Sequence, residues 1–232
     1  MGLGAARHAS DLGAGGRAIA AVPPDPRPRA LRAVRRGLDV VLAAALLALA
    51  APALALAWVA IRIESPGPAI YRQRRTGRGG REFDLLKLRT MVAGAETMGA
   101  GLAVDEGDPR ITRTGALLRR FSLDELPNLV NVLIGDMSLV GPRPTVPSQV
   151  AQYSTRQLGR LAVEPGITGW AQVCGRAALP WHERIELDLW YIEHWSLRLD
   201  ARILLRTAWM LLSGKGLYRG ETGGWRPPPG EP

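Results

Sequence analysis

The chain has 232 residues, enough for one domain with flanking segments, and carries a formal net charge of +9. Such a charge favours an anionic partner, which could be a nucleic acid, an acidic membrane surface or a phosphorylated substrate. The single cysteine, Cys174, excludes an internal disulfide framework.

The first segment of the chain is rich in Arg, Ala, Gly and Pro and has few large apolar side chains. A segment of this kind buries too little apolar surface to offset the entropy that it loses on ordering. We therefore predict a disordered basic leader over residues 1–34. The Gly- and Pro-rich end of the chain predicts a disordered tail over residues 221–232 in the same way.

An uncharged apolar run extends from Val40 to Ile61, long enough for a helix to cross a hydrocarbon core of about 30 Å. Pro52 interrupts the run, and proline removes a helical hydrogen bond and clashes with the preceding turn. Arginines flank the run on both sides, so the positive-inside rule would hold both ends in the cytoplasm. We predict a membrane-inserted, re-entrant helix over residues 35–63 with a break at Pro52. An ordinary spanning helix remains the alternative.

Residues 68–91 form two short extended segments around a Gly-rich turn at 77–80, which predicts a small β-hairpin. In the second strand Lys87 and Arg89 lie two positions apart and therefore on one face. Two cations fixed on a strand could hold a diphosphate, whereas a solvated polar face is the structural alternative.

The stretch "FSLDELPNLVNVLIGD" places Asp124 and Glu125 at the start of an apolar helix, shortly after Arg119. Ser122 or Asp124 would be the N-cap of this helix. In either register the helix dipole would favour ionised carboxylates. Asp124 could then serve as a nucleophile or as a Mg²⁺ ligand, and a plain helix cap is the structural alternative.

Arg143 lies in the following loop, Gly-Pro-Arg-Pro, between two prolines that limit the positions its guanidinium can reach. Arginine binds phosphate well because its planar fork can donate two parallel hydrogen bonds. The loop therefore adds a second candidate phosphate ligand near the Asp-Glu pair.

Towards the C-terminus, "SLRLDARILLRTAWMLLSGKG" repeats arginine at every fourth position, at Arg198, Arg202 and Arg206. A basic face opposite an apolar face that carries Trp is typical of a helix lying in the membrane interface. A surface helix packed on the core is the alternative.

Five segments follow one another in a recognisable order. They are the Pro-interrupted apolar helix, "GPAIYRQRRTGRGGREFDLLKLRTM", "DPRITRTGALLRRFSLDELPNLVNVLIGDMSLVGPRP", "PGITGWAQVCGR" and "WHERIELDLWYIEHWSL". In this order they resemble the bacterial sugar transferases, which are monotopic polyprenyl-phosphate phosphoglycosyl transferases. The resemblance covers about residues 35–218. It implies an α+β, mainly helical fold with a re-entrant membrane helix, a small β-hairpin and amphipathic interfacial helices. It also implies a catalytic domain over residues 64–220 on the cytoplasmic face of the bacterial inner membrane.

The resemblance implies transfer of a sugar phosphate from a UDP-sugar to polyprenyl (undecaprenyl) phosphate with release of UMP. This would be the first membrane step of a surface polysaccharide or glycoconjugate pathway, such as exopolysaccharide biosynthesis. Asp124 would attack phosphorus, form a covalent aspartyl intermediate and bind the Mg²⁺ cofactor, and Glu125 would assist. The implied partners are the UDP-sugar, the polyprenyl phosphate and membrane lipids, and no nucleic acid is expected. Whether the protein forms a homo-oligomer is left open. The implied phosphate ligands are Lys87, Arg89, Arg119 and Arg143.

Two positions depart from the family pattern. Cys174 stands where Asn is expected in "AQVNGR", and Glu164 stands where a basic residue is common. Two other functions also compete: a metal-dependent glycosyltransferase that moves only the sugar, and a basic, membrane-attached binding protein. Charge alone supports the second of these.

Overall fold

The computed structural model describes residues 22–98, 107–175 and 179–213. Its described part is mainly helical with two small sheets, which confirms the predicted α+β, mainly helical class. The predicted tail and most of the predicted leader lie outside the described residues. The helices and strands are α1 (Arg29–Glu64), β1 (Ile70–Thr76), β2 (Glu82–Leu88), α2 (Arg113–Arg120), α3 (Asn128–Ile134), β3 (Ser138–Val140), α4 (Pro147–Val150), β4 (Gly166–Thr168), α5 (Trp170–Cys174), α6 (Trp181–Glu193) and α7 (Leu197–Ser213).

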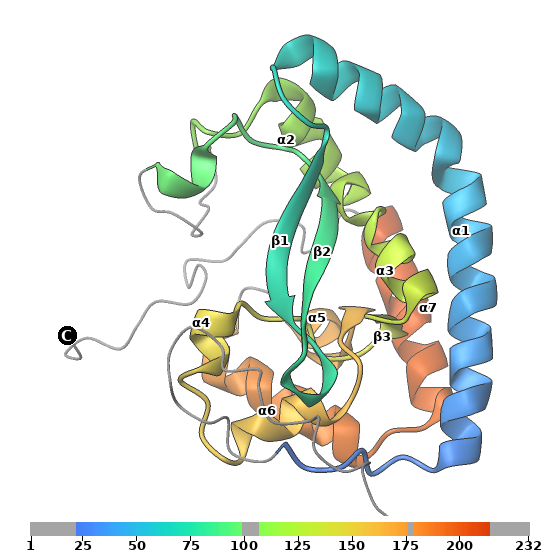
Figure 1. Cartoon of the computed structure of the whole chain (residues 1–232). Coiled ribbons are helices and arrows are strands. Elements are labelled where there is room, and N and C mark those ends of the chain that lie inside the picture. Colours follow the sequence, from blue (N-terminus) through green and yellow to red (C-terminus); the bar gives the residue numbers. More distant parts are fainter. Residues whose placement is uncertain (1–21, 99–106, 176–178, 214–232) are drawn as a thin grey trace, which may run out of the picture.

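The long helix α1 runs along one edge of the molecule, and the other described elements pack on its concave side (Figure 1). The helix continues through Pro52 without interruption, so the break predicted there is not confirmed. Figure 1 instead shows α1 bent partway along its length, as a helix bends when one hydrogen bond is lost and its neighbours survive.

Within the described ranges, α1 is the one helix long and apolar enough to cross a membrane. Only 11% of its most apolar window is buried against protein. At 1.5 Å per residue it is about 54 Å long, well beyond the roughly 30 Å of a hydrocarbon core. A helix that leaves so much apolar surface outside the protein core is suited to contact with lipid, and it associates this chain with a membrane.

Both ends of α1 contact the same folded domain. Near its start, Asp39 Oδ2 accepts a hydrogen bond of 2.6 Å from Ser138 Oγ, at the first residue of β3. At its end, Glu64 accepts the backbone N–H groups of Arg113 (2.7 Å) and Thr114 (2.9 Å) in the first turn of α2. Two groups left free at a helix N-terminus are thereby satisfied, and α1 lies along the domain instead of projecting away from it.

The segment before α1 is part of the folded domain, which corrects the predicted boundary of the leader at residue 34. Arg27 Nη2 pairs with Asp25 (2.8 Å) and with Glu164 (2.6 Å). Glu164 also pairs with Arg78 in the hairpin turn at 2.6 Å. The acidic residue that departs from the family pattern thus fastens the N-terminal segment to the hairpin, and residues 22–34 gain contacts that composition alone did not predict.

The predicted β-hairpin is confirmed. β1 and β2 pair antiparallel from Ile70↔Leu88 to Thr76↔Glu82. A second, unpredicted sheet joins β3 and β4 in parallel, three residues each. These two strands approach so closely that a Cβ on Gly166 would lie 2.1 Å from a backbone nitrogen. The sequence does not predict this sheet, because a strand of three residues is too short to show a periodic pattern.

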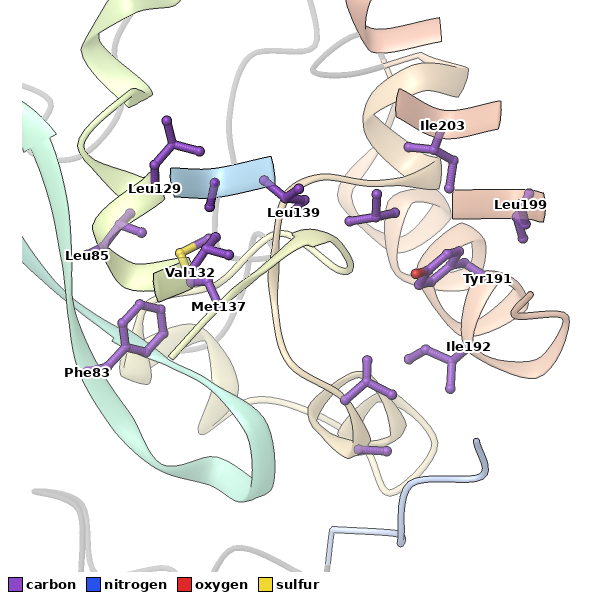
Figure 2. Close-up of a cluster of buried hydrophobic side chains, with 14 residues drawn as sticks. Phe83, Leu85, Leu129, Val132, Met137, Leu139, Tyr191, Ile192, Leu199 and Ile203 are labelled. Atoms are coloured by element: carbon purple, nitrogen blue, oxygen red, sulfur yellow. The ribbon is translucent and has the colours of Figure 1, made fainter. Parts of the chain in front are cut away.

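One hydrophobic core fixes the hairpin, α3 and the C-terminal helices relative to one another. In Figure 2 Leu139 lies between one group of side chains from β2, α3 and their surroundings and another group from α6 and α7. The hairpin and α3 therefore cannot move independently, and the segments at their ends keep a fixed spacing. The labelled core residues are Phe83, Leu85, Leu129, Val132, Met137, Leu139, Tyr191, Ile192, Leu199 and Ile203.

Helix α7 divides into two halves. Its first half buries Leu199 and Ile203 in the core. Its second half leaves Leu205 73%, Trp209 70% and Leu212 86% exposed. The core-packed alternative therefore holds for the first half, while the second half has the free apolar face that the interfacial prediction requires.

Candidate active site

Asp124 and Glu125 lie in a 3₁₀ turn, Leu123–Glu125, that precedes α3. Neither Ser122 nor Asp124 is the N-cap of α3, so that prediction is wrong: Ser122 adopts left-handed angles (φ 54°) and its side chain makes no cap hydrogen bond. Pro127 occupies the N-cap of α3, also without a side-chain cap. Because proline has no N–H group and restricts the residue before it, the chain closes a separate turn first and starts the helix afterwards.

Glu125 is held by two cations that are distant in the sequence. Lys87 Nζ donates to Glu125 Oε1 at 3.0 Å, and the Arg143 guanidinium donates to both oxygens of the same carboxylate. Arg143 and Lys87 keep the pKa of Glu125 well below its usual range, against the effect of its burial, which is the largest single influence. Glu125 is therefore an ionised anchor that places both cations beside Asp124.

Asp124 differs from its neighbour because, among the residues that the structure describes, its carboxylate has no hydrogen-bond or ion-pair partner. Burial raises the pKa of Asp124 to about 6, and the charge of Glu125 raises it further, while Lys87, Arg119 and Arg143 act in the opposite direction. The low pKa expected from the helix dipole is not found, because burial and the charge of Glu125 outweigh the neighbouring cations. At pH 7 the group is still mostly ionised and has free oxygens, as a nucleophile requires.

The pair opens into a cavity of about 1450 Å³. All six residues predicted for the site line this cavity, so the fold brings together positions that span 57 residues of sequence, from 87 to 143. Arg119, on α2, donates from Nε to Thr90 Oγ1 at 2.8 Å and is held at the rim by that contact. The six are Lys87, Arg89, Arg119, Asp124, Glu125 and Arg143.

Arg89 lies at the cavity wall, but its guanidinium is already engaged. It donates to the carbonyl oxygens of Pro66 and Ser65, each at 2.8 Å, immediately after α1. Gly67 makes this possible, since a Cβ there would lie 2.5 Å from Arg89 Nη1. In this arrangement Arg89 fastens the end of α1 to the hairpin, and the phosphate contact predicted for it would have to compete with these bonds.

The sequence analysis missed Arg75, which lines the cavity from β1. Its guanidinium donates to Gln73 Oε1 (3.1 Å) and to the carbonyl of Pro144 (3.1 Å) in the Arg143 loop. Burial, followed by the charge of Arg143, lowers the pKa of Arg75 to about 10, so it stays charged at neutral pH. Alternation along the strand places Tyr71, Gln73 and Arg75 on one face, and all three line the cavity. Ile70 and Arg72 line it as well, so alternation alone does not single out Arg75.

Arg160 was also missed, and it fixes the loop that carries Arg143. This buried arginine donates to the Arg143 carbonyl at 3.0 Å and forms an ion pair of 2.6 Å with Asp188 on α6. This buried ion pair therefore fixes the Arg143 loop to α6, in addition to the two prolines that stiffen the loop. No local pattern marked Arg160, because both partners come from distant segments.

The described residues offer few side chains that could bind the predicted Mg²⁺. No group of three or more His, Cys, Asp or Glu side chains suited to a metal occurs in residues 22–98, 107–175 and 179–213. Magnesium, however, usually takes one or two carboxylates and completes its shell with water and substrate phosphates. The free oxygens of Asp124 fit that manner of binding, whereas those of Glu125 are taken by cations. Binding of Mg²⁺ remains a prediction.

The site places the Asp124 carboxylate in one cavity with Lys87, Arg119 and Arg143, on a protein whose described residues include one long apolar helix. The family model of the bacterial sugar transferases matches residues 30–214. The chain therefore belongs to the bacterial sugar transferase family, and it is a phosphoglycosyl transferase.

Named relatives give the range of activities in the family. The chain is 46% identical, over 91% of its length and 82% of the relative's, to a UDP-glucose:undecaprenyl-phosphate glucose-1-phosphate transferase of Caulobacter vibrioides. It is 42% identical to a UDP-N-acetylgalactosamine-undecaprenyl-phosphate N-acetylgalactosaminephosphotransferase of Aeromonas hydrophila, over 79% of this chain and 44% of the relative. It is 37% identical to an undecaprenyl-phosphate galactose phosphotransferase of Salmonella typhimurium, over 82% of this chain and 43% of the relative. The second and third relatives thus extend well beyond the region they share with this chain.

Proposed function

We propose that this protein transfers a sugar phosphate from a UDP-sugar to undecaprenyl phosphate, releases UMP and so begins a surface polysaccharide or glycoconjugate at the membrane. The names of the relatives support this choice of substrates. The observation that carries it is the unpartnered carboxylate of Asp124, which faces a large cavity beside an ion-paired Glu125.

In the first step an oxygen of Asp124 attacks the sugar-bearing phosphorus of the UDP-sugar. The bond between that phosphorus and the bridging oxygen breaks, and UMP leaves with the bonding electrons. The product is a sugar-phosphoryl-aspartate. Lys87 and Arg143 face the phosphates with positive charge, which stabilises the negative charge that builds up on the leaving group.

In the second step a phosphate oxygen of undecaprenyl phosphate attacks the same phosphorus. The bond to Asp124 breaks and its carboxylate is regenerated, so the product is an undecaprenyl-diphosphate sugar. Two displacements let one site accept two bulky substrates in turn, since UMP has left before the lipid reacts. Asp124 would hold Mg²⁺, which would further neutralise the charge of the diphosphate.

Glu125 serves this scheme by holding the cations. Both of its oxygens are bound by Lys87 and Arg143, so it can orient these side chains before a substrate arrives. A preorganised pair of cations costs no reorganisation when the reaction occurs.

We also propose that both ends of α1 lie on the cytoplasmic face. The support is that Asp39, near one end, and Glu64, at the other, bond to the same folded domain. A straight span would separate its ends by the full thickness of the bilayer. Cysteines at Ala33 and Ile63, in a variant without Cys174, test this in intact cells, and labelling from the periplasm at either position would contradict it.

The reaction is tested with purified protein, undecaprenyl phosphate, Mg²⁺ and a panel of UDP-glucose, UDP-galactose and UDP-N-acetylgalactosamine. We expect UMP to be released with one or more of these donors. Before lipid is added, intact-mass measurement should show the protein heavier by one sugar phosphate. Release of UDP in place of UMP would instead support the glycosyltransferase that moves only the sugar.

A further inference from the structure

The lining of the active-site cavity includes apolar side chains of two helices as well as the polar pair. Five aliphatic side chains from these helices line the cavity: Leu46, Leu49 and Ala50 from α1 and Leu204 and Leu211 from α7. We call this aliphatic part of the cavity the tail groove. The two helices are far apart in the sequence, so only the fold brings these residues to the same space.

The lining of the cavity therefore has two chemically different parts. One part carries Lys87 and Arg143 around the carboxylates, and the other part is aliphatic. Leu49, which lines the groove, is 80% exposed, so the aliphatic part is open at the surface of the helix that we place in lipid. A ligand that matches both parts has an anionic phosphate head and a hydrocarbon chain that leads into the bilayer.

A sugar nucleotide does not match the aliphatic part, because its sugar, ribose and base all carry polar groups that would be desolvated there without partners. The lipid acceptor matches both parts. Its phosphate must reach the phosphorus held at Asp124, and its isoprenoid chain must pass from that point to the membrane.

We propose that the tail groove binds the first isoprene units of undecaprenyl phosphate and thereby positions its phosphate for the second displacement. This inference rests on the proposed function and extends it by assigning the lipid chain to a wall of α1 and α7. The groove takes no part in the first displacement, which needs only the UDP-sugar.

The test narrows the groove and compares acceptors of different length. Ala50→Trp places a large ring at the groove, and Ala48→Trp is the matched control on the exposed side of the same helix, outside the cavity. We expect Ala50→Trp to raise KM for undecaprenyl phosphate about tenfold, as the loss of one or two buried aliphatic contacts would. Ala48→Trp should stay close to wild type.

Geranyl phosphate, with a chain of only two isoprene units, separates the tail from the head. Because the two units of this acceptor fill only part of the groove, Ala50→Trp should reduce its use much less than it reduces the use of undecaprenyl phosphate. If Ala50→Trp lost as much activity with geranyl phosphate as with undecaprenyl phosphate, or behaved like Ala48→Trp with both acceptors, the tail groove would be disproved.

A second pair of variants tests the wall of the groove that α7 provides. It also keeps the proposal testable if Ala50→Trp does not fold. Leu211 lines the groove, while its neighbour Leu212 is 86% exposed and lies outside the cavity. Leu211→Trp should show the same dependence on acceptor length, and Leu212→Trp should not. If excess phosphatidylethanolamine slowed wild type but not Ala50→Trp, a phospholipid chain would be the occupant and the proposal would be overturned.

The sugar-phosphate adduct, formed without lipid, distinguishes this proposal from the proposed function. Wild type and all four variants should form it at similar rates. Absence of the adduct in wild type would refute the covalent mechanism itself. Normal adduct formation without any dependence on acceptor length would refute the tail groove alone.

Discussion

Two acidic residues in this molecule have similar pKa values and opposite environments. Burial raises the pKa of Asp124 and that of Asp200 each to about 6. Asp200 accepts hydrogen bonds from Tyr191 (2.6 Å) and Trp195 (3.0 Å) and pairs with Arg35 at 3.0 Å, whereas the Asp124 carboxylate faces a cavity without such partners. A perturbed pKa therefore does not identify the reactive group here. Free oxygens in an accessible cavity do.

The most severe test of this comparison is to replace each residue with Asn. Asp124→Asn keeps the size but removes the nucleophile, so adduct formation and UMP release should fall by about three orders of magnitude or more. Its Tm should hold or rise slightly, because a desolvated charge beside Glu125 is removed. Differential scanning calorimetry and intact-mass measurement check both expectations.

Asp200→Asn should give the reverse result. It weakens a fully partnered buried carboxylate, which costs about 1.5–3 kcal/mol when hydrogen bonds to a charged group are lost. Its folded fraction should still form the adduct. If Asp124→Asn turned over at a substantial fraction of the wild-type rate, Asp124 would have no nucleophilic role and the contrast with Asp200 would be lost.

A second comparison separates the two cations of the β2 strand end. Lys87 contacts Glu125 in the site, whereas Arg89 fastens the end of α1. Lys87→Gln should reduce adduct formation about a hundredfold, as loss of one preorganised charge does, with little change in Tm. Arg89→Gln should lower Tm clearly and leave the activity of the folded fraction close to that of wild type. If Arg89→Gln instead kept its Tm and lost activity, Arg89 would bind phosphate, as the sequence predicts.

The pH dependence sharpens the assignment further. Since the pKa of Asp124 is raised to about 6, protonation below that pH removes the nucleophile, and the rate of adduct formation should fall as pH drops through about 6. Glu125→Gln removes one cause of the raised pKa, so the acidic limb should move to lower pH even as the maximal rate declines. An acidic limb that stayed in place would mean that another group controls it.

The smallest expected effect concerns the junction after α1. Gly67→Ala combines a positive φ of 107° with a contact of 2.5 Å to Arg89, so it should lower stability by about 1–3 kcal/mol. Gly79→Ala is the control, because φ is also positive there (67°) but no atom lies within 4 Å of the added Cβ. Chemical denaturation should rank Gly67→Ala as the more destabilising change. Equal losses would show that Arg89 does not press on this position.

The sequence by itself determined the features that depend on neighbouring residues. An uncharged apolar run specifies a long helix, alternation around a Gly-rich turn specifies the hairpin, and the family motifs identify Asp124 and Glu125 as the pair of interest. Each of these patterns is complete within a short window, and so it can be recognised before any long-range contact is known.

Tertiary structure decided the features that depend on distant residues. Arg27 and Glu164 pair across 137 positions, so composition could not predict that residues 22–28 are folded. The pKa of Asp124 follows from its burial and from charges on three other segments, which overrode the expectation from the helix dipole. The same holds for the use of Arg89 at the α1 junction, because a local window gives the face on which a side chain lies, and only the packed fold supplies its partner.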